Sequence, residues 1–213
     1  MNRRRTAFSA AAFAVGFVLV IVAVTQLHHD RRTPANFAVP APTVSHSATP
    51  RVSSPTPASS AKPTAAPPAP VTLSLPALNV RATVRQVVTT NGVLGVPDNI
   101  ADVGWWTGGA RPGSAAGSTV IDGHVDSAVT GTGTLFHLSQ LQAGDLVTIT
   151  DAAGVLRHYR VYQRQVFLKH DGLPADLFTT AGTPRLVMIT CGGPFDRATR
   201  NYLDNVVVFA APV

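Results

Sequence analysis

The stretch DLVTITDAAGVLRHYRVYQRQVFL (145–168) decides the fold class of this protein. Two runs rich in β-branched and aromatic residues, 146–150 and 156–168, flank a short segment of Asp, Ala and Gly that is typical of a turn. The stretch therefore predicts an antiparallel hairpin that turns at 151–154.

Similar runs recur along the C-terminal two thirds of the chain. They are short, rich in β-branched residues and bounded by Gly, Pro, Asp or Asn: 73–80, 82–90, 118–125, 184–190 and 205–211. Helical signals are brief and lie at 136–142 and 174–178. Because strands do not alternate with helices, the pattern excludes a parallel Rossmann-type sheet. It predicts a mainly β domain over 73–213 that closes, or nearly closes, into a barrel.

The first 72 residues differ from this domain in composition. After a basic tail (1–5), the segment 6–27 contains an uncharged apolar run long enough to cross a bilayer as a helix. Residues 28–72 are rich in Pro, Ser, Ala and Thr and hold ten of the 17 prolines, which predicts a disordered stalk. We expect a single-pass signal anchor in the cell membrane. The alternative is a long, cleaved signal peptide, and both place the domain outside the cytoplasm.

The net charge of +6 has a local origin. Five arginines flank the apolar run, at 3–5 and at 31 and 32, and without them 12 basic residues face 11 acidic ones. The domain is therefore nearly neutral, and nucleic-acid binding is not expected.

The only cysteine of the chain lies in LVMITCGGPFD (186–196), where a β-branched run ends at Cys191 and Gly192 and Gly193 follow. Outside the cytoplasm this thiol has no partner in its own chain, so it is a small core residue, an intermolecular link or a free reactive thiol. In VIDGHVDS (120–127), His124 likewise follows an apolar run. A histidine activates a thiol nucleophile when the fold brings them together. His170, in a loop, is a weaker competitor.

The chain has no CxxC or HExxH motif and no phosphate-binding glycine motif. We therefore expect no metal and no cofactor.

The domain resembles the sortases, the membrane-anchored cysteine transpeptidases of Gram-positive bacteria, and within them the actinobacterial class F group. The resemblance is carried by Gly123 and His124 in VIDGHVDS, by Thr190 and Cys191 in LVMITCGG, and by the segments around them. It implies a closed eight-stranded β-barrel with one or two short helices. It also implies that Cys191 attacks an LPxTG-like sorting signal of a secreted protein to form a thioacyl enzyme, while His124 transfers protons. An amine from a cell-wall precursor or a pilin lysine would then accept the acyl group.

Many sortases also carry an arginine on the last strand, aimed at the oxyanion. Aligned by its closing apolar run, this chain has Asn205 at that register, while Arg197 and Arg200 lie upstream. We expect one of these three to stabilise the oxyanion, with both arginines as solvated turn residues as the alternative. The other substrate-binding candidates sit beside the two motifs: Thr190, Gly192 and Asp126. Asp126 either orients His124 or caps the turn after it.

Two other functions stay open at this level. An L,D-transpeptidase also uses Cys and His, but its S-x-G-C-x-R motif disagrees with Thr190 before and Gly192 after the cysteine. A non-enzymatic, tethered wall-binding module predicts instead that Cys191 is buried and reacts slowly with alkylating reagents.

Overall fold

The fold is seen in a computed structural model that describes residues 33–42 and 66–213. The predicted basic tail and anchor (1–27) and residues 28–32 and 43–65 of the predicted stalk lie outside the described residues. Within the described ranges, no helix is long and apolar enough to span a membrane.

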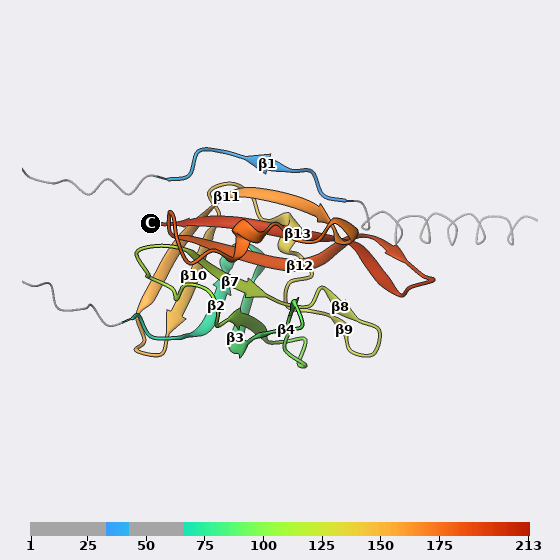
Figure 1. The fold of residues 1–213 in the computed structure, drawn as a ribbon, viewed down its shortest axis with the longest axis horizontal. Helices are drawn as coiled ribbons and strands as arrows, with labels where there is room; N and C mark the ends of the chain where they lie inside the picture. The colour runs from blue at the N-terminus through green and yellow to red at the C-terminus, as the bar shows by residue number, and fades with distance from the viewer. Residues whose placement is uncertain (1–32, 43–65) are drawn as a thin grey trace, which may run out of the picture. The chain divides into compact units, whose positions relative to one another are not determined.

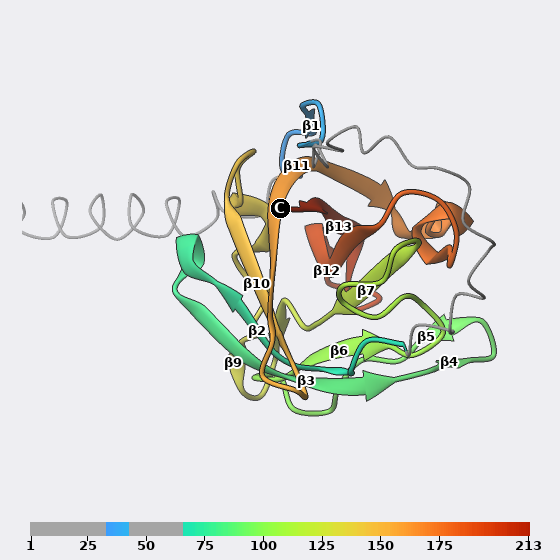
Figure 2. The same cartoon turned by 90° about the vertical axis from the view of Figure 1, so that its left-hand side faces the viewer.

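Eight strands of the described chain form a closed barrel. In spatial order they are β11, β10, β2, β3, β6, β7, β12 and β13, and β13 pairs back onto β11 to close the ring (Figures 1 and 2). Their bounds are β2 Pro70–Leu75, β3 Val80–Val87, β6 Val103–Trp106, β7 Ser118–Asp122, β10 Leu146–Asp151, β11 Leu156–Leu168, β12 Arg185–Asp196 and β13 Asn201–Pro212. The prediction of a mainly β, closed eight-stranded barrel is confirmed.

The connections carry only short elements. There are two small hairpins, β4 Thr89–Thr90 with β5 Val93–Leu94 and β8 Asp126–Ser127 with β9 Gly131–Thr132. The 3₁₀ turns are η2 Pro76–Leu78, η3 Leu138–Gln140, η4 Lys169–Asp171 and η5 Ala175–Phe178. The helical signals at 136–142 and 174–178 correspond to η3 and η5.

The hairpin predicted from 145–168 is present as β10 and β11. Its strands pair from Leu146↔Arg160 to Thr150↔Leu156. The Asp151 carboxylate accepts hydrogen bonds from the backbone N–H groups of Ala153 (3.0 Å) and Val155 (2.9 Å), which holds the turn in place.

Alternation along the strands builds two apolar clusters. One fills the barrel and takes side chains from every barrel strand, including Leu186 and Met188 of β12. The other lies on the opposite face of β7, β12 and β13, and contains Val187 and Ile189 of β12 with Leu177 of η5. The strand β12 is therefore covered on both faces, as its unbroken apolar run indicates.

Several strands differ from the sequence-based expectation. The run 73–80 is split because Pro76 has no N–H for the sheet: β2 ends at Leu75, η2 follows, and Asn79 takes a left-handed backbone with φ 53°. The four-residue strand β6 was not predicted. β12 continues past Cys191, with a register shift between Gly192 and Phe195.

A short N-terminal segment, residues 33–42, lies along the barrel, although the sequence assigns it to the stalk. Its strand β1 (Phe37–Ala38) pairs antiparallel with β11, as the blue strand in Figure 1 shows. The buried guanidinium of Arg164 donates two hydrogen bonds to the Ala35 carbonyl, at 2.7 and 2.9 Å, and stacks 4.8 Å from the ring of Phe37. Composition did not predict that this segment packs on the barrel, because much of the contact consists of main-chain hydrogen bonds to β11, which do not depend on side-chain type.

Candidate active site

The strands that carry the two motifs lie side by side. β7 and β12 run parallel, and their last register pair is Asp122↔Ile189. Beyond this pair the Gly123 N–H donates to the Ile189 carbonyl (3.1 Å), and the Thr190 hydroxyl donates to the Gly123 carbonyl (2.8 Å). His124 and Cys191 are the residues that follow this junction, so the fold brings the backbones of these two predicted site residues to neighbouring positions, His124 just past the end of β7 and Cys191 within β12.

Side-chain alternation determines which face of the sheet each residue occupies. Cys191 shares its face with Val187 and Ile189, whereas Thr190 is buried on the barrel side. His124 lies two residues past the end of β7, the strand that contributes Val120 to the outer cluster. Cys191 and His124 are both half-buried. The thiol is thus partly accessible, whereas the non-enzymatic alternative required burial.

The imidazole of His124 is held by a backbone carbonyl. Its Nε2 lies 2.8 Å from the Pro97 carbonyl oxygen. A carbonyl only accepts hydrogen bonds, so this contact assigns the proton to Nε2 and leaves Nδ1 as the acceptor of the neutral ring.

A lysine that the sequence analysis missed contacts the cysteine. The ammonium of Lys169, the first residue of η4, lies 3.2 Å from Cys191 Sγ and 2.7 Å from Asn201 Oδ1. One signal was present in the sequence: Lys169 is the only lysine between 73 and 213. His170 beside it pairs with Asp171 on the exposed surface, 3.1 Å away.

The three candidates for the oxyanion take different positions. Asn205 of β13 is the register partner of Cys191, so their side chains leave the same face of the sheet. Arg197 and Arg200 are exposed in the turn that joins β12 to β13, and Arg200 has a left-handed backbone, φ 52°. Among the contacts of the described residues, neither arginine bonds to Cys191 or His124.

Gly192 and Asp126 are both fixed by neighbours on β13. Gly192 is buried, and a Cβ there would lie 2.6 Å from Val206 Cγ2, so no larger residue fits without a shift. Asp126 accepts a hydrogen bond from the Tyr202 hydroxyl. That bond ties the β8 hairpin to β13 and gives Asp126 a partner other than His124.

A buried acid, Asp122, lies two residues before His124, at the end of β7. Asp122 is 4% exposed, and neither of its carboxyl oxygens finds a hydrogen-bond partner of normal geometry among the described residues. Burial raises its pKa to about 7, and the nearby backbone N–H groups of Asp122 and Gly104 offset only part of this effect. Asp122 is therefore largely neutral well below pH 7.

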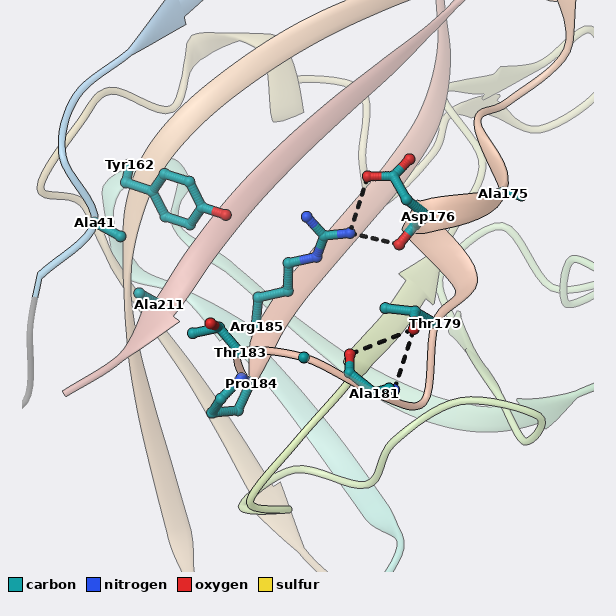
Figure 3. Close-up of a pocket in the computed structure, with 11 residues that line it drawn as sticks. Ala41, Tyr162, Ala175, Asp176, Thr179, Ala181, Thr183, Pro184, Arg185 and Ala211 are labelled. Atoms are coloured by element: carbon teal, nitrogen blue, oxygen red, sulfur yellow. Dashed lines mark hydrogen bonds and ion pairs between the residues drawn. The ribbon is translucent and has the colours of Figure 1, made fainter.

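No group of three or more His, Cys, Asp or Glu within the described ranges could hold a metal ion. A cavity of about 640 Å³ lies away from the cysteine, around Tyr162, Asp176 and Arg185 (Figure 3). Arg185 begins β12, six residues before Cys191, or roughly 20 Å along an extended strand. This cavity therefore does not contain the candidate site.

The closed barrel carries a cysteine within β12 and a histidine just past the end of the adjacent strand β7, and these are the residue types of thiol-based acyl transfer. Residues 73–213 match the sequence profile of the sortase domain. The chain belongs to the sortase family, whose members are cysteine transpeptidases.

Solved sortases share the fold. Sortase A from Corynebacterium diphtheriae, in a lid-mutant form, is 22% identical with a TM-score of 0.51, covering 70% of this chain and 72% of that one. Sortase C-1 from Actinomyces oris is 18% identical with a TM-score of 0.52, covering 67% and 72%. No significant sequence match was found among curated proteins.

Proposed function

We propose that the protein is a class F-like sortase, held in the cell membrane by residues 6–27 with its barrel outside the cytoplasm. Its substrates are secreted proteins with a C-terminal LPxTG-like sorting signal, and its acceptor is an amine of the cell wall or a pilin lysine. The family match supports the reaction class. The motifs around His124 and Cys191 support the class F assignment, and the apolar run at 7–24 supports the anchor.

In the proposed reaction His124 accepts the thiol proton, and Cys191 Sγ attacks the threonine carbonyl of the sorting signal. A C–S bond forms and the carbonyl electron pair moves to oxygen. When this tetrahedral intermediate collapses, the C–N bond breaks and the departing amine takes the proton from His124. The incoming amine then attacks the thioester, passes a proton to His124 and releases the Cys191 thiolate.

One observation carries this proposal: Cys191 and His124 directly follow the hydrogen-bonded junction of β7 and β12. That junction is rigid because Thr190 is buried and bonded to Gly123. The two reactive side chains therefore start from fixed neighbouring backbones, which lowers the entropic cost of bringing them together.

The test is transfer of a fluorogenic LPxTG-type peptide to an amine acceptor by the full chain in detergent or membranes. Cys191→Ala should abolish thioester formation and transfer, and His124→Ala should nearly abolish both. Cleavage or transfer by Cys191→Ala would overturn the assignment. Turnover of a peptidoglycan tetrapeptide in place of the sorting peptide would favour the L,D-transpeptidase alternative.

A further inference from the structure

We propose that Lys169 supplies the positive charge of the active site. In the resting enzyme its ammonium donates a hydrogen bond to Cys191, and during attack it donates to the oxygen that becomes negatively charged. This inference rests on the proposed function, because it assigns a role in that reaction.

The contact between Lys169 and Cys191 is built by three adjacent strands. β11, β13 and β12 lie in that order, and Phe167, Asn205 and Cys191 form one row across them. Lys169 follows Phe167 by two residues, where β11 gives way to η4. The side chain thus reaches Sγ from beyond the end of β11, across β13.

The ammonium is held by a second contact. Asn201 Oδ1, at the start of β13, accepts a hydrogen bond from Lys169 Nζ at 2.7 Å, shorter than the 3.2 Å to Cys191 Sγ. A lysine ammonium has three N–H donors, and these two contacts use two of them. The third remains for an oxygen of a bound substrate.

None of the other oxyanion candidates has both a positive charge and a position next to Cys191. Arg197 and Arg200 carry charge but lie exposed in the turn, and Asn205 is paired with Cys191 but neutral. Lys169 has both features. A charged donor that strengthens its bond as negative charge grows on the substrate oxygen accelerates the chemical step and not merely binding.

Lys169 acts without changing its bonds. When Cys191 attacks, the C–S bond forms and the carbonyl electron pair moves to oxygen; the ammonium keeps its three protons and stabilises that oxygen electrostatically. Loss of one such donor costs roughly a hundred- to a thousandfold in rate. Proton transfer remains with His124.

The test compares Lys169→Met, Lys169→Arg and Asn201→Asp with the wild-type full chain. Arg81→Met, which removes an exposed charge on β3, is the matched control. Two quantities are measured: kcat and KM for the sorting peptide, and the ratio of Cys191 alkylation rates with anionic iodoacetate and neutral iodoacetamide. Circular dichroism and thermal melting identify the folded variants.

We expect Lys169→Met to lower kcat roughly a hundred- to a thousandfold, with little change in KM, and Lys169→Arg to restore part of the loss. The iodoacetate to iodoacetamide ratio should fall several-fold in Lys169→Met, fall less in Asn201→Asp, and stay unchanged in Arg81→Met. Wild-type kcat in folded Lys169→Met, or an unchanged reagent ratio, would overturn the proposal.

The reagent ratio does not depend on the substrate, so the two proposals fail separately. If wild-type protein processes no sorting peptide, the proposed function fails. The ratio then still shows whether Lys169 governs the charge at Cys191, and an unchanged ratio in Lys169→Met rejects that charge independently.

Discussion

The hydroxyl of Thr190 donates a hydrogen bond to the carbonyl of Gly123 at 2.8 Å, and this bond ties together the strands that carry Cys191 and His124. Thr190 is 4% exposed, so the bond is made away from solvent. It explains why a threonine, rather than an apolar β-branched residue, directly precedes the cysteine.

Replacing Thr190 by valine keeps the shape but leaves the Gly123 carbonyl without this donor. We expect Thr190→Val to lower the free energy of unfolding by about 1–3 kcal/mol and to slow acylation of Cys191. Thr190→Ser keeps the hydroxyl and should retain most of the acylation rate. Urea unfolding and peptide cleavage measure the two effects; equal acylation rates in the valine variant and the wild type would contradict this role.

Asp122 predicts a pH dependence of stability. Its pKa is about 7 in the folded state, against 3.8 for the ordinary value, so between these pH values the folded chain holds a proton that the unfolded chain has released. The contribution of this group to stability therefore decreases as pH rises from about 4 to 7. The loss should approach roughly 4 kcal/mol above pH 7.

Asp122→Asn should remove this dependence, so the variant gains stability relative to wild type as pH rises from 4 to 8. Urea unfolding across this range gives the difference between the two proteins. Asp98→Asn, at an exposed position, is the control and should track the wild type. A constant difference between Asp122→Asn and wild type at every pH would show that Asp122 titrates normally.

The contacts of Arg164 indicate that this side chain holds the N-terminal segment, residues 33–42, on the barrel. Besides Ala35, its guanidinium bonds to the carbonyls of Ser139 and Leu141, so one buried side chain joins residues 33–42, η3 and β11. We expect Arg164→Met to weaken all of these contacts and to expose the Val39 amide, which bonds to the Tyr162 carbonyl at 2.8 Å.

Hydrogen exchange measured by mass spectrometry should show faster exchange over 37–39 in Arg164→Met. The matched control is Arg160→Met, which removes an exposed arginine of the same strand that bonds to the Gly144 carbonyl. Equal exchange over 37–39 in the two variants would argue that Arg164 does not hold this segment.

The hydrogen bond from Tyr202 to Asp126 indicates a structural role for Asp126. Because Asp126 accepts a hydrogen bond from Tyr202, removal of either partner should loosen the β8 hairpin. Asp126→Asn should therefore leave the pH profile of kcat close to that of wild type. A displaced pH profile would instead support the alternative that Asp126 orients His124.

The strands that the sequence predicted best are long and strongly patterned. β11 was predicted with its observed bounds, 156–168, because β-branched and aromatic residues recur along the whole run and no Gly or Pro interrupts it before the loop at Lys169. β6 and β1 have four and two residues, too few to show a period. β1 is held largely by backbone bonds and by Arg164, which leave little trace in local composition.

In the candidate site, too, local sequence patterns predicted some residues and missed others. Cys191 and His124 stood out because each follows an apolar run in a recognisable motif. Lys169 did not, because it meets Cys191 across β13 and 22 residues away in sequence, and no local pattern encodes that contact. Asp122 was hidden for a related reason: its unusual pKa comes from burial by neighbouring strands.

Peptide-mapping mass spectrometry shows whether Cys191 forms the acyl link to the sorting signal. The full chain is mixed with an LPxTG-type peptide library without an amine acceptor, quenched in acid and digested. We expect a hydroxylamine-sensitive acyl adduct on the peptide that contains Cys191, absent in Cys191→Ala and strongly reduced in His124→Ala. An adduct at another residue, or peptide cleavage that continues in Cys191→Ala, would contradict this expectation.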